Sequence, residues 1–186
     1  GAQNDVRLYR IVTTTTLPDT GEVLDVTGLL ALPAGAAGTV PVVSWQHGTI
    51  LCFDQVPSNM TKLADGGYVL SDEADSLETL FNLHRFAARG FAVIAADYVG
   101  KGPLRGARGE AYGVKEATVA TCTSILNAGM DAMRALGLDV PLMVFAVIAP
   151  IATVVTALPI SINGIGVREG VLGYLLGLYG GDASTS

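Results

Sequence analysis

The order of apolar patterns along the chain constrains its fold most strongly. Two runs rich in β-branched and apolar residues, 6–16 and 22–33, flank the turn cluster LPDTGE, which predicts a β-hairpin. A short apolar run at 40–46 then predicts a central strand. A helical pattern over 75–90, a buried strand starting at Phe91 and a second helical pattern over 114–136 follow. This order predicts an α/β fold with a mostly parallel sheet and helices on both faces.

The first of these helices has a defined apolar face and a defined end. Apolar residues recur at helical spacing, and they are Leu77, Leu80, Phe81, Leu83, Phe86 and Ala87. Gly90 is expected to cap the carboxyl end of this helix. The segment between the central strand and this helix predicts a long irregular connection, of the kind that is usually functional or mobile.

Charge is unevenly distributed along the 186 residues. The net charge is −6 and no basic run occurs, which argues against nucleic acid as a partner. Residues 140–167 carry no charge, and after Asp139 the charged residues are Arg168, Glu169 and Asp182. We therefore expect one domain over 1–138, truncated and finished by a hydrophobic carboxyl-terminal tail over 139–186.

Residues 141–160 of this tail leave two interpretations open. The uncharged run is long enough to span a bilayer core. Alternatively, its β-branched residues and the interruptions at Pro150 and Pro159 favour a buried strand plus a core helix. We favour a soluble protein over a membrane-associated one, because a tail that completes a core accounts for an ordered chain more simply. The first residues show no basic-then-apolar leader, so a cytoplasmic protein and a secreted mature protein both fit.

Neither a metal nor an organic cofactor is predicted. Cys52 and Cys122 lack metal-ligand spacing and lie far apart, so two buried thiols are expected rather than a disulfide. No His/Cys/Asp cluster has ligand spacing. The glycine-rich stretch 100–106 lacks the Gly-Lys-Ser/Thr end that a phosphate-binding loop needs to hold Mg²⁺.

Three stretches in a fixed order carry a family resemblance: PVVSWQHGT, then FAARGFAVIAADYVGKG, then a helix that ends AMRALGL. Over residues 6–138 the chain resembles the α/β-hydrolases, in particular bacterial esterases and secretory lipases. The resemblance implies hydrolysis of a small carboxylic ester. It also implies that the turn of His47, Gly48, Thr49 and Ile50 forms part of an oxyanion hole, with the N–H of Thr49 or Ile50 as the donor.

The same resemblance gives other residues a structural role. Asp97, Gly100 and Gly102 match the turn that shapes the loop after the buried strand that begins at Phe91. We expect them to hold this loop rather than to take part in the reaction.

The catalytic triad of such enzymes has no clear counterpart in the sequence. No Gly-x-Ser-x-Gly elbow occurs, and the nearest match is PISIN around Ser161, where Pro159 and Asn163 stand in place of the glycines. The two histidines are His47 and His84, and neither follows the position of the nucleophile. Because a hydroxyl needs a positioned base, an incomplete triad is predicted, with Ser161 a weak candidate nucleophile and the catalytic residues otherwise unassigned.

The tail carries a second resemblance. The stretch LPISINGIGVREGVLGYLLGLYG is similar to part of the integral-membrane family that includes the lysylphosphatidylglycerol synthase flippase region, over about residues 140–181. The match covers a small piece of such a protein, so no lipid chemistry is inferred. Arg168 and Glu169 suit either a membrane-buried pair or an ion pair that caps a helix. The chain is therefore interpreted as truncated and chimeric.

Three functions remain open on the sequence: an ester hydrolase, a non-catalytic scaffold that self-associates, and a fragment anchored in a membrane through 141–160. Half of a doubly wound sheet leaves an open edge. Two copies could pair through that edge or through the apolar tail, which makes a homo-oligomer plausible. Residues 141–150 could instead add a parallel strand beside the buried strand that begins at Phe91.

Overall fold

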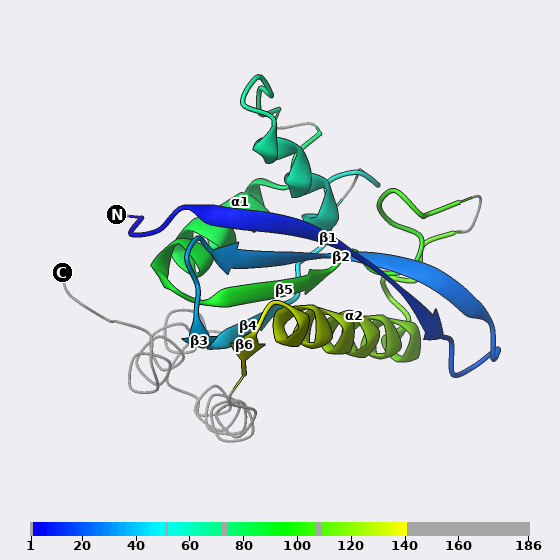
Figure 1. Cartoon of the computed structure of the whole chain (residues 1–186). Helices are drawn as coiled ribbons and strands as arrows, with labels where there is room; N and C mark the ends of the chain where they lie inside the picture. Colours follow the sequence, from blue (N-terminus) through cyan, green and yellow to red (C-terminus); the bar gives the residue numbers. More distant parts are fainter. Residues whose placement is uncertain (1, 51, 72–73, 107–108, 141–186) are drawn as a thin grey trace, which may run out of the picture.

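The structure, a computed structural model, describes residues 2–50, 52–71, 74–106 and 109–140 (Figure 1). Its main sheet has the order β1-β2-β5-β4, from strands β1 (Val6–Thr16), β2 (Val23–Pro33), β5 (Ala92–Ala96) and β4 (Val42–Trp45). β1 and β2 form the expected antiparallel hairpin, and β2 also pairs antiparallel with β5. β4 and β5 are parallel. The sheet therefore joins an antiparallel start to a parallel part.

A short parallel pair that the sequence patterns did not indicate extends this arrangement. β3 (Gly38–Thr39) pairs with β6 (Leu138–Asp139), and the N–H of Val40 donates to the carbonyl of Asp139 at 2.9 Å. The next residue, Pro41, forms its hydrogen bond on the other side of the strand, because its carbonyl accepts from the N–H of Ala92 on β5 at 2.8 Å. The β3–β4 segment thus runs between β5 and β6. β6 spans the position at which the domain and the apolar tail were expected to meet.

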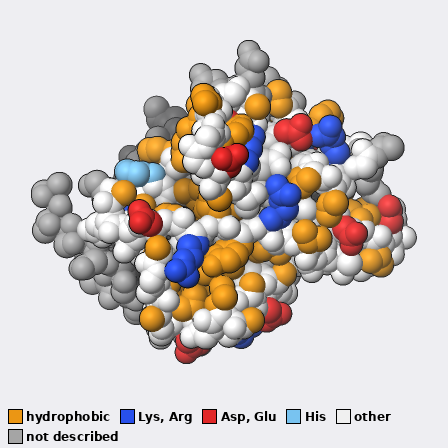
Figure 2. All heavy atoms as spheres, turned by 45° about the horizontal axis from the view of Figure 1, so that its top comes forward, with side chains coloured by type: hydrophobic (Ala, Val, Ile, Leu, Met, Phe, Trp, Pro, Cys, Tyr) orange, Lys and Arg blue, Asp and Glu red, His pale blue; other side chains and the backbone are white. Residues whose placement is uncertain are grey.

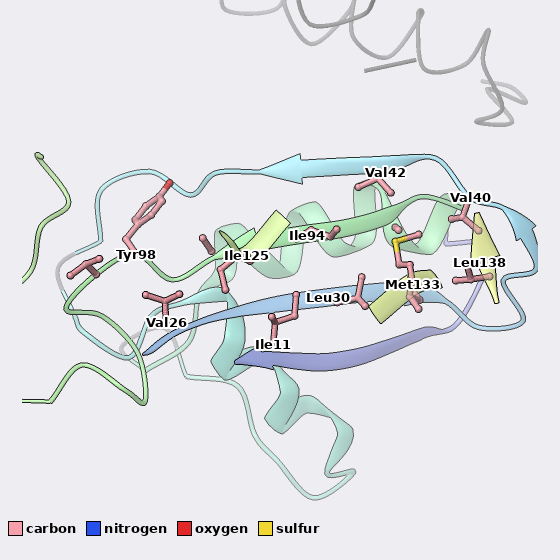
Figure 3. Close-up of a cluster of buried hydrophobic side chains, with 14 of the residues drawn as sticks. Ile11, Val26, Leu30, Val40, Val42, Ile94, Tyr98, Ile125, Met133 and Leu138 are labelled. Carbon is pink, nitrogen blue, oxygen red and sulfur yellow. The ribbon is translucent and has the colours of Figure 1, made fainter. Parts of the chain in front are cut away.

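Helices cover both faces of the sheet, as the order of elements predicts. α2 (Lys115–Ala135) packs on one face, over a core that includes Leu30, Ile94 and Ile125 (Figures 1 and 3). η1 (Pro57–Ala64), α1 (Leu77–Arg85) and η2 (Ala87–Arg89) lie on the other face. β2 serves both cores, because its side chains alternate between the faces. The fold is α/β, with the sheet between two helical layers.

Two glycines allow α2 to lie close to the sheet. A Cβ on Gly28 of β2 would meet Ile125 Cγ2 of α2 at 2.6 Å, and a Cβ on Gly129 of α2 would meet Ile94 Cδ1 of β5 at 2.7 Å. Each glycine therefore accepts a large aliphatic side chain from the opposite layer. This reciprocal fit sets the spacing between helix and sheet.

The helix expected over 75–90 is shorter in the structure. Ser76 caps its start by accepting the N–H of Thr79, but α1 ends at Arg85 and a 3₁₀ turn, η2, follows. Gly90 closes η2 in the left-handed conformation, with φ of 102°. The predicted apolar face is only partly used, since Phe81 is 61% exposed. On the face seen in Figure 2, apolar side chains lie between single charged side chains of both signs.

The irregular connection contains one ordered element, η1. It is held against the sheet by Val56 and Met60, which are fully buried. Farther along, Asp75 accepts the hydroxyl of Tyr68 at 2.9 Å and forms an ion pair with Lys62. Although burial opposes ionisation of Asp75, these partners lower its pKa below 3.8. η1 is thus held against the sheet, and Asp75 ties the later part of the connection to η1 through Lys62.

In the described sheet, β2 and β4 occupy the two edges of β5. The stretch 141–150, which was expected to add a strand beside β5, lies outside the described residues. Among the described residues the main sheet ends at β1 and β4. Within this same part of the chain, no helix is long and apolar enough to cross a membrane. The stretch 141–160, on which the membrane interpretation rests, lies outside the described residues.

Candidate functional site

The predicted oxyanion turn lies where two parallel strands end. His47 to Ile50 follow β4, and Asp97 and Tyr98 follow β5 at the same carboxyl edge. His47 is buried, with 2% of its surface exposed, and its ring centroid lies 4.2 Å from that of Tyr98. The two loops are therefore in direct contact.

The carbonyl groups of the turn are held by buried side chains. The hydroxyl of Tyr98 donates to the carbonyl of His47 at 3.0 Å. Nδ1 of His47 donates to the carbonyl of Gly48 at 2.8 Å. Nζ of Lys101 donates to the carbonyl of Ile50 at 3.2 Å. Three of the four carbonyls in this turn thus point toward the protein.

The N–H groups of the turn face the other way. In a trans peptide the C=O and N–H point in opposite directions, so the bond to the Gly48 carbonyl turns the N–H of Thr49 away from the interior. The N–H groups of Thr49 and Ile50 have no hydrogen-bond partner among the described residues. The N–H of Gly48 donates to Oε2 of Glu78 at 3.3 Å. With respect to the described ranges, the turn thus presents two donors without a partner, and a carboxylate lies beside them.

Neither histidine is placed to act as the base of a triad at this turn. Both ring nitrogens of His47 face carbonyl oxygens, because Nε2 lies 3.4 Å from the carbonyl of Asp97. His84 is exposed on α1, where it lines a cavity of about 570 Å³ together with residues of β1 and η1. It lies six residues after Glu78, which is about 9 Å of helix rise away from the turn. Neither ring therefore reaches the donors of the turn as a base would.

Asp97 is enclosed by the fold. Its side chain is fully buried, and it accepts the hydroxyl of Thr27 at 2.5 Å and the N–H of Ser58 at 2.9 Å. Burial raises the pKa of this carboxyl above 3.8, although its hydrogen bonds oppose the shift. With its oxygens committed to β2 and η1, Asp97 can hold these elements together but cannot reach a substrate at the turn.

The two glycines predicted to shape the loop after β5 sit in tight places. Gly100 and Gly102 have φ of 79° and 73°, in the region that favours glycine. A Cβ on Gly102 would lie 2.6 Å from Oδ2 of Asp97, and a Cβ on Gly100 would lie 2.5 Å from Cα of Glu110. Larger residues at either position would push the loop off its neighbours.

Sequence reasoning missed the side chains that surround the turn. Tyr98 and Lys101 lie in the stretch ADYVGKG, which was interpreted only as a turn. Lys101 is 4% exposed and pairs with Glu110. No local pattern reveals these contacts, because Tyr98 and His47 are 51 residues apart. The aromatic residue next to Asp97 was the one available signal.

The cysteines are free, and one expectation about them was wrong. Cys52 is exposed rather than buried, because it lies in the surface connection after β4. Cys122 is half-buried on α2, and its Sγ donates to Oε1 of Gln46 at 2.8 Å. Burial raises the pKa of the Cys122 thiol to about 11, which keeps it a thiol, and therefore a weak nucleophile, at neutral pH.

The remaining predicted residue, Ser161, lies outside the described residues. Within the described ranges, no three His, Cys, Asp or Glu side chains come together as a metal site would need. The part of the site that can be assigned is therefore the turn and its supports.

This fold is similar to those of several solved structures. No protein-family model and no curated protein matches the sequence. A crystal structure from Legionella pneumophila with a hydrolase assignment matches 75% of this chain at a TM-score of 0.57 and 24% identity. The rice cell wall degrading esterase LipA from Xanthomonas oryzae matches 73% at a TM-score of 0.53 and 21% identity. The fold is that of an α/β-hydrolase. Because the chain covers 35% and 32% of these neighbours, it spans about a third of an α/β-hydrolase of their length.

Proposed function

We propose that this chain is a carboxylic ester hydrolase of the α/β-hydrolase type with an oxyanion turn at Thr49 and Ile50 and an incomplete Ser-His-Asp triad. The observation that carries the proposal is the pair of N–H groups of Thr49 and Ile50 at the carboxyl edge of β4 and β5, which have no partner within the part of the chain that the structure describes. The carbonyl of Gly48 is bonded to His47, so the N–H of Thr49 in the same peptide points away from the interior, as an oxyanion donor needs to. The esterase neighbours add support at the level of the fold.

The chemistry expected of such a turn is modest. A small ester binds with its carbonyl oxygen near the N–H of Thr49, and water attacks the carbonyl carbon while it gives one proton to bulk solvent. The carbonyl oxygen becomes negative. When its C=O bond re-forms, the C–O bond to the alkoxide breaks, and the alkoxide takes a proton from solvent, which leaves the acid and the alcohol. Without a complete triad, an oxyanion hole and substrate binding still give a rate about 10³–10⁴ above that of the reaction in water. We therefore expect slow turnover of activated esters.

The test combines turnover with covalent labelling. The chain is assayed with p-nitrophenyl acetate and butyrate, and it is treated separately with a serine-reactive phosphonate, followed by peptide mapping. Slow turnover without a labelled serine is the expected result. A labelled serine, whether Ser161 or another, would disprove the incomplete triad. The absence of turnover above buffer would disprove the proposal and leave a non-catalytic scaffold.

A matched pair of variants tests the turn itself. Thr49→Pro removes the N–H donor, whereas Thr49→Ala keeps it and removes only the side chain, which contacts Tyr112 at 3.3 Å. Turnover should fall by about 10²-fold in Thr49→Pro, as for other oxyanion donors, and stay near wild type in Thr49→Ala. Unfolding midpoints of both variants show whether the loss comes from the site or from the fold.

Two further points belong to this proposal. Among the described residues β4 pairs on one side only, so pairing of two copies through that edge is testable by size-exclusion chromatography. A soluble protein should be recovered without detergent. Recovery from membranes alone would favour the fragment anchored through 141–160.

A further inference from the structure

We infer that Tyr98 is the positioning residue of the oxyanion turn, acting through His47. This inference rests on the proposed function, since it assigns a role to a side chain outside the turn. Tyr98 has three separate features that point to this role: its backbone conformation, its contact with the ring of His47 and its hydrogen bond to the backbone of the turn.

The backbone of Tyr98 adopts a conformation that bulky residues avoid. Its φ is 69°, and no other non-glycine residue in the described ranges has a positive φ. In this region Cβ crowds the backbone, so the conformation persists only where surrounding contacts hold it. Tyr98 is 4% exposed, and it follows directly after Asp97, whose carboxylate is bonded to Thr27 and Ser58. The strained residue is therefore held in a rigid frame.

This conformation lets residues 97 and 98 contact His47 at three points. The Tyr98 ring packs on the imidazole with centroids 4.2 Å apart, and the hydroxyl donates to the carbonyl of His47 at 3.0 Å. The carbonyl of Asp97 lies 3.4 Å from Nε2. Figure 3 shows the side chain of Tyr98 with its hydroxyl directed toward the segment that follows β4.

Through these three contacts, Asp97 and Tyr98 fix the orientation of His47 and, through it, the direction of the N–H of Thr49. With its ring and carbonyl held, His47 presents Nδ1 to the carbonyl of Gly48 at 2.8 Å. That bond fixes the plane of the next peptide, and hence the direction of the N–H of Thr49. Small errors in donor direction weaken oxyanion stabilisation sharply. Loss of the Tyr98 hydroxyl should therefore slow the reaction without blocking substrate binding.

The test compares Tyr98→Phe with Tyr68→Phe. Both variants lose one tyrosine hydroxyl that donates a hydrogen bond, but Tyr68 bonds Asp75 and does not touch the turn. Steady-state kinetics with p-nitrophenyl acetate should give a kcat about 10-fold lower in Tyr98→Phe, with KM within about twofold. Tyr68→Phe should keep both constants even where it lowers the unfolding midpoint. An unchanged kcat in Tyr98→Phe, or an equal loss in both variants, would overturn the inference.

A second measurement separates this inference from the proposed function. Amide resonances of Gly48 and Thr49 are recorded by ¹⁵N NMR in wild type and in both variants. Tyr98→Phe should shift or broaden these two resonances, whereas Tyr68→Phe should leave them in place. If wild type shows no turnover, the proposed function fails, and unperturbed amides in Tyr98→Phe would then refute the positioning role on its own.

Discussion

The reciprocal glycine–isoleucine packing between α2 and the sheet makes a sharp prediction about Gly129→Ala. In an open helix this change is favourable by about 1 kcal/mol, because glycine is the poorer helix former. Here the new Cβ would lie 2.7 Å from Cδ1 and 3.0 Å from both Cγ1 and Cγ2 of Ile94. Overpacking of a filled core costs about 1–3 kcal/mol. The variant should therefore lose about 1 kcal/mol of unfolding free energy rather than gain it.

Two controls separate the opposing effects. Asn127 is exposed on the same helix, so the difference between Asn127→Ala and Asn127→Gly measures helix propensity alone. Ile94→Ala removes the atoms that the new methyl would meet and costs about 2–5 kcal/mol by itself. Combined with Gly129→Ala, it should cost clearly less than the sum of the two single changes, because the methyl fills the vacated space.

Urea unfolding followed by circular dichroism gives the free energies for this double-mutant cycle. The reasoning fails if Gly129→Ala stabilises the chain as much as the Asn127 pair predicts. It also fails if the two changes at 94 and 129 are additive, since the layers would then not be in contact there.

Three further predictions concern the site and its supports. Burial raises the pKa of Asp97 above 3.8 in the folded chain, so between pH 3.8 and that raised pKa the folded state binds more protons than the unfolded state. The free energy of unfolding should therefore fall as the pH rises through this range. Urea titrations at several pH values should show a flatter dependence in Asp97→Asn. Glu78→Ala removes a negative charge beside the N–H of Gly48 and should raise kcat for p-nitrophenyl acetate by about two- to fivefold, with a lower kcat counting against an oxyanion at this turn. Gly102→Ala should cost more stability than Gly106→Ala in thermal unfolding, because both have positive φ but only the former would meet Asp97; equal losses would mean that backbone strain alone matters.

The elements that sequence reasoning located share one property: their patterns are local. α2 was expected over 114–136 and spans Lys115–Ala135, and the hairpin of β1 and β2 follows its β-branched runs. Each pattern reports which side chains can be buried together within one element. Element type and approximate bounds therefore follow from the residues themselves.

The parts that escaped prediction depend on contacts between distant residues. η1 is held by burial of Met60 under the sheet and by the bond from Ser58 to Asp97, which lie 39 residues apart. β6 is a two-residue strand whose existence depends on β3, far earlier in the chain. The supports of the turn, Tyr98 and Lys101, bond residues 51 positions away. A pattern within one short segment cannot indicate a partner that lies 39 or 51 residues away.

The place of the turn, by contrast, follows from topology. From β4 the chain crosses through η1 and α1 to β5, which lies between β4 and β2. From β5 it crosses through α2 to β6, which lies on the other side of the β3–β4 segment. Because parallel crossovers are right-handed, two crossovers in opposite directions put their helices on opposite faces of the sheet. The carboxyl ends of β4 and β5 therefore lie at a switch point of the sheet, the kind of place at which α/β proteins bind their ligands. His47 and Tyr98 follow these two strands and contact each other there, so the topology accounts for the place of the turn and of the side chain that holds it.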